Sequence, residues 1–129
     1  MSLANATNDK YYVIVSPTVN FKTTGLTTLW TTPVNATFLA LTYTIVCDTA
    51  TAANGDSVFN VGWTPATYTD FLDTQSPNIL TANTYSNTVV EAGLIPPVFP
   101  ASTAIVLNIT SAETGTALTG RFIFSGIYL

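Results

Sequence analysis

A thirteen-residue stretch without glycine or proline, residues 36–48, constrains the fold more than any other segment. Side chains of a β-strand alternate between its two faces. Counting alternate positions places one apolar set on the first face: Leu39, Leu41, Tyr43, Ile45 and Cys47. The second face then carries Phe38, Ala40, Thr42, Thr44, Val46 and Asp48. The stretch therefore predicts one long strand, with Cys47 as a buried thiol on the apolar face.

Shorter alternating segments follow the same pattern, and no segment of ten residues shows helical periodicity. The predicted strands are 11–16, 36–48, 58–63, 86–90, 104–110 and 120–128. Asn54-Gly55-Asp56 marks a turn, and residues 67–72 suggest one helical turn. The prolines within 94–101 oppose regular pairing, so that segment is a loop or an edge. Seven or eight short strands predict an all-β fold, an antiparallel β-sandwich or barrel. We expect one domain over 11–129, preceded by an N-terminal arm over 1–10.

The composition excludes several partners. Only 8% of the residues are charged, against about 25% in an ordinary domain. The net charge is −4, and the bases Lys10, Lys22 and Arg121 are scattered, which argues against nucleic acid. No segment is long and apolar enough to insert into a membrane, and residues 1–10 lack the order of a signal peptide. Cys47 has no partner for a disulfide, so we expect synthesis in a reducing cytoplasm.

The inventory of reactive side chains argues against catalysis. The chain has no histidine and one cysteine, which removes the commonest general base and any tetrahedral zinc site. We expect solvated turn or cap roles for the carboxylates: Asp9, Asp48, Asp56, Asp70, Asp73, Glu91 and Glu113. Calcium at Asp70 and Asp73 is an alternative, as is a small glycosidase with two of these groups. The prediction is a non-enzymatic protein without cofactor or metal.

Two segments carry large side chains on both faces, which a simple sandwich does not bury. These are 11–16 and 120–128, and the cover is either another subunit or part of the same chain. The favoured interface residues are Tyr11, Tyr12, Ile14, Arg121, Ile123 and Ile127. Arg121 either pairs with a carboxylate or faces water. Several aromatics could instead form a sugar-stacking platform, although aromatics of β proteins usually belong to the core. The candidate ligand contacts are Trp30, Tyr68, Phe71 and Tyr85.

The arrangement of these segments is similar to that of a known group of proteins. A long alternating strand ends in a Gly turn, a Trp63 strand and a half-turn at 68–72 follow, and then come the segments 100–112 and 122–129. Over 28–129 this resembles the small jelly-roll proteins of tailed-bacteriophage virions. Those proteins are capsid decoration (cement) proteins or head domains of tail fibres.

The resemblance implies a fold, partners and a location. The fold would be a jelly roll of about eight strands, and the protein a homo-oligomer, with a trimer favoured. Its partners would be the major capsid protein or other virion proteins, and its location the virion. No catalytic residues transfer. The alternative function is a tail-fibre domain that recognises a host surface glycan, but the early start of the β domain favours decoration.

Overall fold

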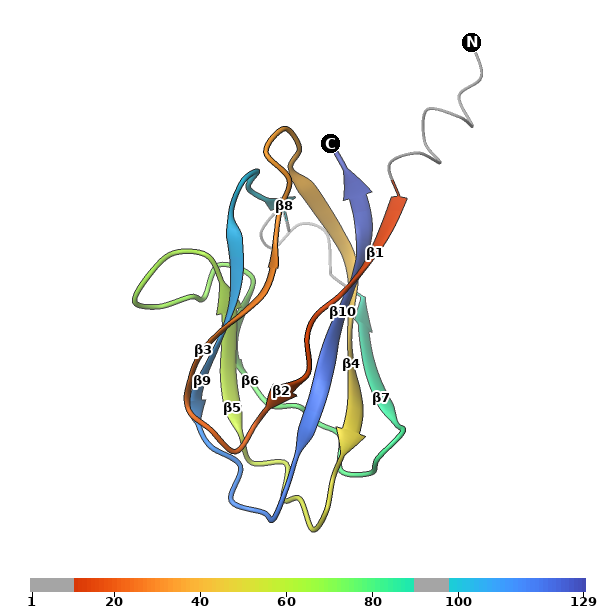
Figure 1. Ribbon diagram of the computed structural model, residues 1–129, viewed down its shortest axis with the longest axis vertical. Coiled ribbons are helices and arrows are strands. Elements are labelled where there is room, and N and C mark those ends of the chain that lie inside the picture. The colour runs from red at the N-terminus through yellow and green to blue at the C-terminus, as the bar shows by residue number, and fades with distance from the viewer. Residues whose placement is uncertain (1–10, 90–97) are drawn as a thin grey trace.

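The computed structural model describes residues 11–89 and 98–129 as a two-layered β-structure (Figure 1). The predicted arm over 1–10 and the segment 90–97 lie outside the described residues. The strands are β1 (Tyr11–Val15), β2 (Val19–Asn20), β3 (Gly25–Thr31), β4 (Phe38–Thr49), β5 (Val58–Gly62), β6 (Leu72–Gln75), β7 (Tyr85–Val89), β8 (Val98–Phe99), β9 (Ala104–Ser111) and β10 (Thr119–Tyr128). No described residue is helical, so the predicted helical turn at 67–72 is wrong.

Two antiparallel sheets form the layers, which confirms the predicted all-β sandwich. The β10 sheet has the order β1-β10-β4-β7, with β2 also paired to β10 and β8 to β4. The β9 sheet has the order β3-β9-β5-β6. Most successive strands lie in different sheets; β5 and β6 are an exception, because they pair with each other. The two layers are therefore tied together by the chain itself.

The core between the sheets is dominated by aromatic rings. Six phenylalanines have no exposed surface: Phe21, Phe38, Phe59, Phe99, Phe122 and Phe124. Trp30 packs edge-on against Phe38, with 4.9 Å between ring centroids, and Phe99 packs edge-on against Phe124 at 5.7 Å. Edge-to-face contacts of this kind add to the free energy gained by burying the rings.

A β-bulge in β4 overturns part of the predicted facing. Ser125 of β10 pairs with Thr42, whereas the next residue, Gly126, pairs with Ala40, so Leu41 is an extra residue. Beyond the bulge the alternation is reversed: Ala40 is buried and Leu41 is 37% exposed. The predicted faces are thus wrong for residues 38–41.

On the other side of the bulge the predicted facing is confirmed. Ile45 and Cys47 are buried, and Tyr43 packs against the core. The long strand therefore contributes to the core along its whole length, but with a change of phase at Leu41.

Candidate interaction surface

The outer side of the β10 sheet is defined by the register of its strands. Phe122 and Phe124 of β10 face the core, so the alternate residues of β10 face outward. Directly paired residues share a face. The outward pairs between β1 and β10 are Val15 with Ile123, Val13 with Ser125, and Tyr11 with Ile127.

The neighbouring strands continue these rows. Ile123 pairs with Thr44, Ser125 with Thr42, and Ile127 with Leu39 of β4. Leu39 pairs in turn with Val98 of β8, and Val46 of β4 with Tyr85 of β7. We call these residues the outer face: Tyr11, Val13, Val15, Leu39, Thr42, Thr44, Val46, Tyr85, Val98, Arg121, Ile123, Ser125 and Ile127, with Asp48 beside Arg121.

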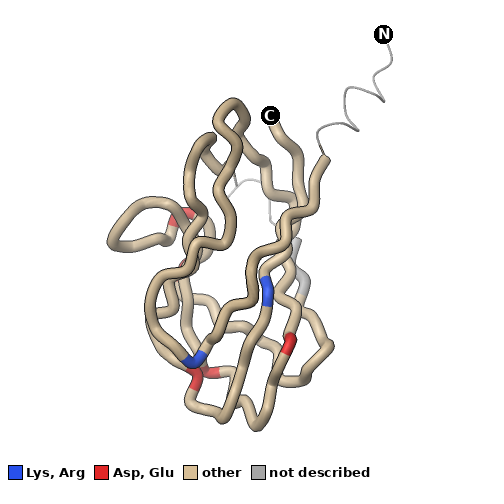
Figure 2. The backbone as a smooth tube through the Cα atoms, in the orientation of Figure 1, with Lys and Arg blue, Asp and Glu red and all other residues tan. Residues whose placement is uncertain are grey.

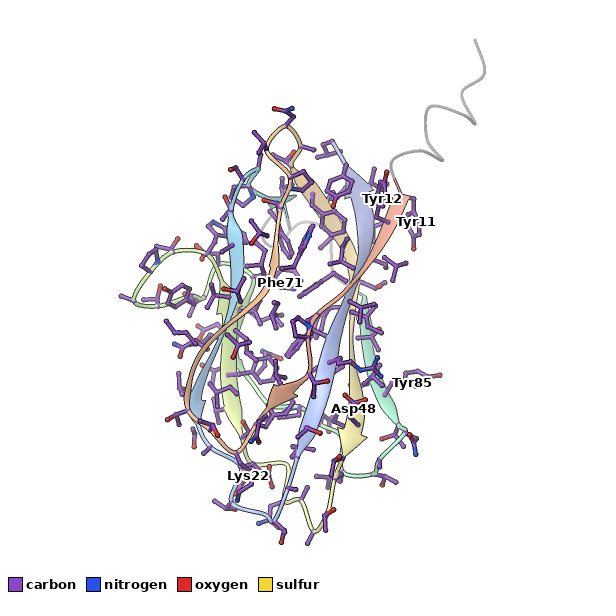
Figure 3. All side chains as sticks on the ribbon, viewed as in Figure 1. Tyr11, Tyr12, Lys22, Asp48, Phe71 and Tyr85 are labelled. Atoms are coloured by element: carbon purple, nitrogen blue, oxygen red, sulfur yellow. The ribbon has the colours of Figure 1, made fainter. Side chains whose placement is uncertain are left out.

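The outer face exposes large apolar side chains to solvent. Tyr11 is 52% exposed, Val13 57%, Val15 51% and Tyr85 72%. Tyr85 projects from β7 away from the sandwich (Figure 3). Figure 1 shows no described strand that covers the outer side of this sheet. A sheet with one solvated side usually presents polar residues there. An extended apolar face of this kind marks an interaction surface.

Four polar side chains of the outer face are already paired with each other. The hydroxyls of Thr42 and Ser125 share a hydrogen bond. The Arg121 guanidinium donates to the Asp48 carboxylate through Nη2 at 3.0 Å and through Nε at 3.1 and 3.2 Å. The Arg121 and Asp48 side chains are 40% and 29% exposed, so this ion pair adds little stability. It does leave the face with no net charge (Figure 2).

The outer side of the β9 sheet differs in chemistry. Asn60 of β5 pairs with Asn108 of β9, and Thr28 of β3 pairs with Val106. The amide oxygen of Asn60 accepts a hydrogen bond from the Thr74 N–H at 2.8 Å. This side therefore carries polar pairs at its centre, although Leu26 of β3 is 58% exposed there, and the larger set of exposed apolar side chains lies on the β10 sheet.

The six predicted interface residues divide into two groups. Arg121, Ile123 and Ile127 lie together with Tyr11 on the outer face. Tyr12 points to the other side of β1 (Figure 3), and Ile14 lies on that same side by alternation along the strand. Tyr12 packs edge-on against the Tyr128 ring at 4.8 Å, and Ile14 packs against the core.

The predicted ligand contacts are not gathered on one surface. Trp30 and Phe71 both pack against Phe99 inside the sandwich, with ring centroids 6.0 and 4.9 Å apart. Tyr68 lies in the turn after β5, where its N–H donates to Thr64 O at 2.9 Å. Tyr85 belongs to the outer face.

A buried carboxylate at one end of the sandwich was missed by sequence reasoning. Glu113 is 2% exposed, so its predicted solvated role is wrong. Its Oε1 accepts N–H groups of Asn54, of Gly55 at 3.1 Å and of Gly115 at 3.1 Å, and its Oε2 accepts the Asp56 N–H at 3.2 Å. The side chain thus joins the turn after β4 to the turn before β10. The glycine turns at Gly55 and Gly115 were the only sequence signal.

Lys22 covers the same end of the molecule (Figure 3). Its Nζ donates to the carbonyl oxygens of Gly115 at 2.5 Å and Glu113 at 3.4 Å. These bonds satisfy carbonyl oxygens of the turn, so the arrangement is structural.

The proposed calcium ligands have other partners. The Asp70 carboxylate accepts the Trp63 N–H at 2.6 Å and the Thr64 N–H and hydroxyl at 2.7 and 2.6 Å. Partial burial acts to raise the pKa of Asp70, but these hydrogen bonds outweigh it and hold the pKa below its ordinary value. Asp73 accepts from Thr74. Over the described ranges, no three acidic or sulfur-bearing residues come together as metal ligands would.

Cys47 has the buried position that the sequence predicts. It is 1% exposed, and desolvation raises the pKa of its thiol, with a smaller contribution from Asp48. A buried, protonated thiol is unreactive.

Comparison with known proteins finds chains of similar fold among solved structures. No family model matches the sequence, and no curated protein matches it. A chain of the acidic stable capsid structure of Helicobacter pylori bacteriophage KHP30 has a TM-score of 0.60 and 13% identity, covering 93% of this chain and 88% of that one. A chain of the cyanophage Pam1 capsid asymmetric unit has a TM-score of 0.54 and 20% identity, covering 93% and 86%. The chain shares its fold with proteins of these two phage capsid structures. None of its described segments is a helix that could cross a membrane.

Proposed function

We propose that the chain is a non-enzymatic structural protein of a bacteriophage virion, a decoration or cement protein that binds the head through its outer face. The observation that carries the proposal is the apolar, uncharged outer face on a fold shared with two phage capsid chains. A decoration protein must adhere by surface complementarity, and an apolar sheet face whose charged groups are paired with each other suits that task.

The strand order supports a jelly roll. Four strands, β1-β10-β4-β7, face four others, β3-β9-β5-β6, and pairing between strands distant in sequence predominates. Two four-stranded antiparallel sheets of this kind are the architecture of the jelly rolls found in viral capsids.

The stabilising effect would follow from selective binding. A protein that binds the assembled shell, and not its free subunits, lowers the free energy of the assembled state. Apolar residues such as Ile123 and Val46, partly exposed in the single chain, would lose their remaining water contact on docking. The major capsid protein is the expected partner.

The tail-fibre alternative depends on exposed aromatics. Of its four predicted contacts, Trp30 and Phe71 are engaged in the core. Tyr85 alone among them is strongly exposed, at 72%. Binding to a glycan array at micromolar strength, lost in Tyr85→Ala, would favour this alternative.

The test uses two matched variants on central strands. Ile123→Asp lies on the outer face of β10, and Val106→Asp lies on the outer side of β9; both wild-type residues are partly exposed aliphatics. Particles of the source phage are stripped with mild denaturant and the recombinant chain is added back. Wild type and Val106→Asp should sediment with the shells, while Ile123→Asp stays in the supernatant. Absence of the chain from untreated particles, by mass spectrometry, would overturn the proposal.

A further inference from the structure

Strand β1 is an edge strand without the features that normally protect an edge. Among the described residues it pairs with β10 alone, on one side. Natural edge strands carry charges, prolines or bulges that discourage pairing with another chain. Tyr11–Val15 contains none of these, and its pairing with β10 is regular over all five residues. Such a strand is a template for strand addition.

The register identifies the backbone groups on the free edge. Ser16, which follows β1, donates its N–H to Phe122 O of β10 at 2.8 Å. N–H and C=O directions alternate along a strand, so those of Ile14 and Tyr12 also point to β10. The peptide groups of Tyr11, Val13 and Val15 point the other way, to the open side of the sheet.

The inner side of β1 is fixed in place. Tyr12 packs against Tyr128 at 4.8 Å, and Ile14 packs against the core. The strand is therefore held in an extended conformation before any partner arrives, which lowers the entropic cost of pairing.

We propose that β1 pairs with β1 of a second copy of this chain, antiparallel and centred on Val13. In this register Val13 faces Val13 of the second copy and Tyr11 faces Val15, so every outward-pointing peptide group finds a partner. Three hydrogen-bonded pairs give about six backbone bonds. Tyrosine opposite valine is a favourable cross-strand pair.

Pro17 excludes registers shifted toward the C-terminal end of β1. A pairing centred on Val15 would place Val13 opposite Pro17, which has no N–H to donate. Centring on Val13 keeps all three free residues of β1 paired with each other.

The charge distribution on β1 does not oppose a second copy as the occupant. Two copies of a chain with net charge −4 repel, so they associate best through a contact that is itself uncharged. Strand β1 has no charged residue, and the nearby Arg121 and Asp48 neutralise each other at 3.0 Å. A strongly charged strand from another protein would find no complementary group on β1.

Pairing would also join two outer faces into one continuous surface, because Tyr11, Val13 and Val15 lie between them. This inference deepens the proposed function by naming the contact between copies, and it gives a two-fold pair in place of a trimer. A five-residue strand contact is smaller than a standard stable interface, so we expect a Kd on the order of micromolar.

The test compares Val13→Lys with Leu26→Lys. Val13→Lys places two ammonium groups opposite each other across the two-fold axis. Leu26 is 58% exposed on β3, the edge strand of the other sheet, and serves as the matched control. By native mass spectrometry and sedimentation over 1 to 500 µM (nearly three decades, upward from the expected Kd), wild type and Leu26→Lys should form dimers. The Kd of Val13→Lys should be at least about tenfold weaker, and mixing it with Val13→Glu should restore a mixed dimer.

Hydrogen exchange supplies a second readout that does not depend on a variant. The amides of Tyr12 and Ile14 should be protected at every concentration, and those of Tyr11, Val13 and Val15 only as the dimer forms. A wild-type monomer at the highest concentration, or a trimer unaffected by Val13→Lys, would overturn the pairing. Protection of the free-edge amides only on phage particles would assign the edge to a shell protein, leaving the proposed function intact.

Discussion

Glu113 is a buried polar residue whose replacement should destabilise the fold. Its carboxylate accepts four backbone N–H groups while 2% exposed. Glu113→Gln replaces one acceptor oxygen by an amide group that faces N–H donors. We expect the free energy of unfolding to fall by about 2 kcal/mol, because hydrogen bonds to a charged group are lost in a buried setting.

Urea denaturation with a linear extrapolation measures this loss. Thr28→Ala on the exposed side of β3 is the control, with an expected change within about 0.5 kcal/mol. An equally small change in Glu113→Gln would mean that water replaces the carboxylate without cost.

Asp70 should make the free energy of unfolding depend on pH in the acidic range. Its pKa is held below the ordinary value in the folded state, so its stabilising effect is present above the unfolded pKa and is lost as the pH falls through the folded pKa. Asp70→Asn should therefore be less stable than wild type at pH 7 (a neutral reference, well above the carboxyl range). The difference should shrink below about pH 4.

Thermal unfolding at several pH values measures that difference. Asp73→Asn, at an exposed position close by in the sequence, should show a smaller difference at neutral pH. If the stability difference between wild type and Asp70→Asn stayed constant as the pH falls, the assigned role of the carboxylate would be contradicted.

At single positions, burial was predictable from the sequence where the local alternation of a strand determines it. Cys47 lies between Val46 and Asp48 in a clear alternation, and its burial was predictable. Glu113 lies in a polar turn, and its burial depends on Asn54 and Gly55, some sixty residues away in the sequence. No local pattern contains that information.

At the scale of strands, the bulge in β4 could not be located from the pattern. Residues 38–41 are all apolar (Phe-Leu-Ala-Leu), so either face of that segment is compatible with burial. The bulge is fixed by the pairing of Gly126 with Ala40, which is a tertiary event. Strands β2, β3 and β6 were also not predicted, since β2 has only two residues and β3 is rich in threonine. The two residues of β8 lie in the segment 94–101, for which the sequence left a loop or an edge open.

The bulge in β4 leaves no room for a side chain at Gly126 of β10. A Cβ at Gly126 would lie 2.0 Å from the Leu39 carbonyl oxygen and 2.8 Å from Phe38 Cζ. Gly126→Ala must therefore displace the backbone of β4. We expect a loss of about 1–3 kcal/mol in the free energy of unfolding, as for overpacked cores.

The measurement is again urea denaturation, with Ser125→Ala beside it in the same strand. Ser125 loses only a hydroxyl that bonds to Thr42, so its variant should cost about 1 kcal/mol or less. A Gly126→Ala protein as stable as wild type would mean that the bulge can relax away from β10.

For the whole molecule, the two-sided character of 11–16 and 120–128 was the most informative sequence signal. Both segments lie side by side as β1 and β10, and their outward residues form the outer face. The four predicted ligand contacts do not share one surface, because Trp30 and Phe71 pack between the sheets. Counting aromatic residues cannot distinguish a ring in the core from one on a surface.

Pairing through β1 should make stability depend on protein concentration. Only the folded chain can present β1 as an ordered edge, so dimerisation stabilises the native state by mass action. Above the Kd, each tenfold rise in concentration should add about 0.7 kcal/mol per chain, half of the 1.4 kcal/mol of a tenfold ligand effect, since two chains share one contact. The Tm should rise by about 2–4 °C per decade of concentration. Scanning calorimetry of wild type and Leu26→Lys should show this slope, and Val13→Lys should lose it, because a Tm set by the core alone does not change with dilution.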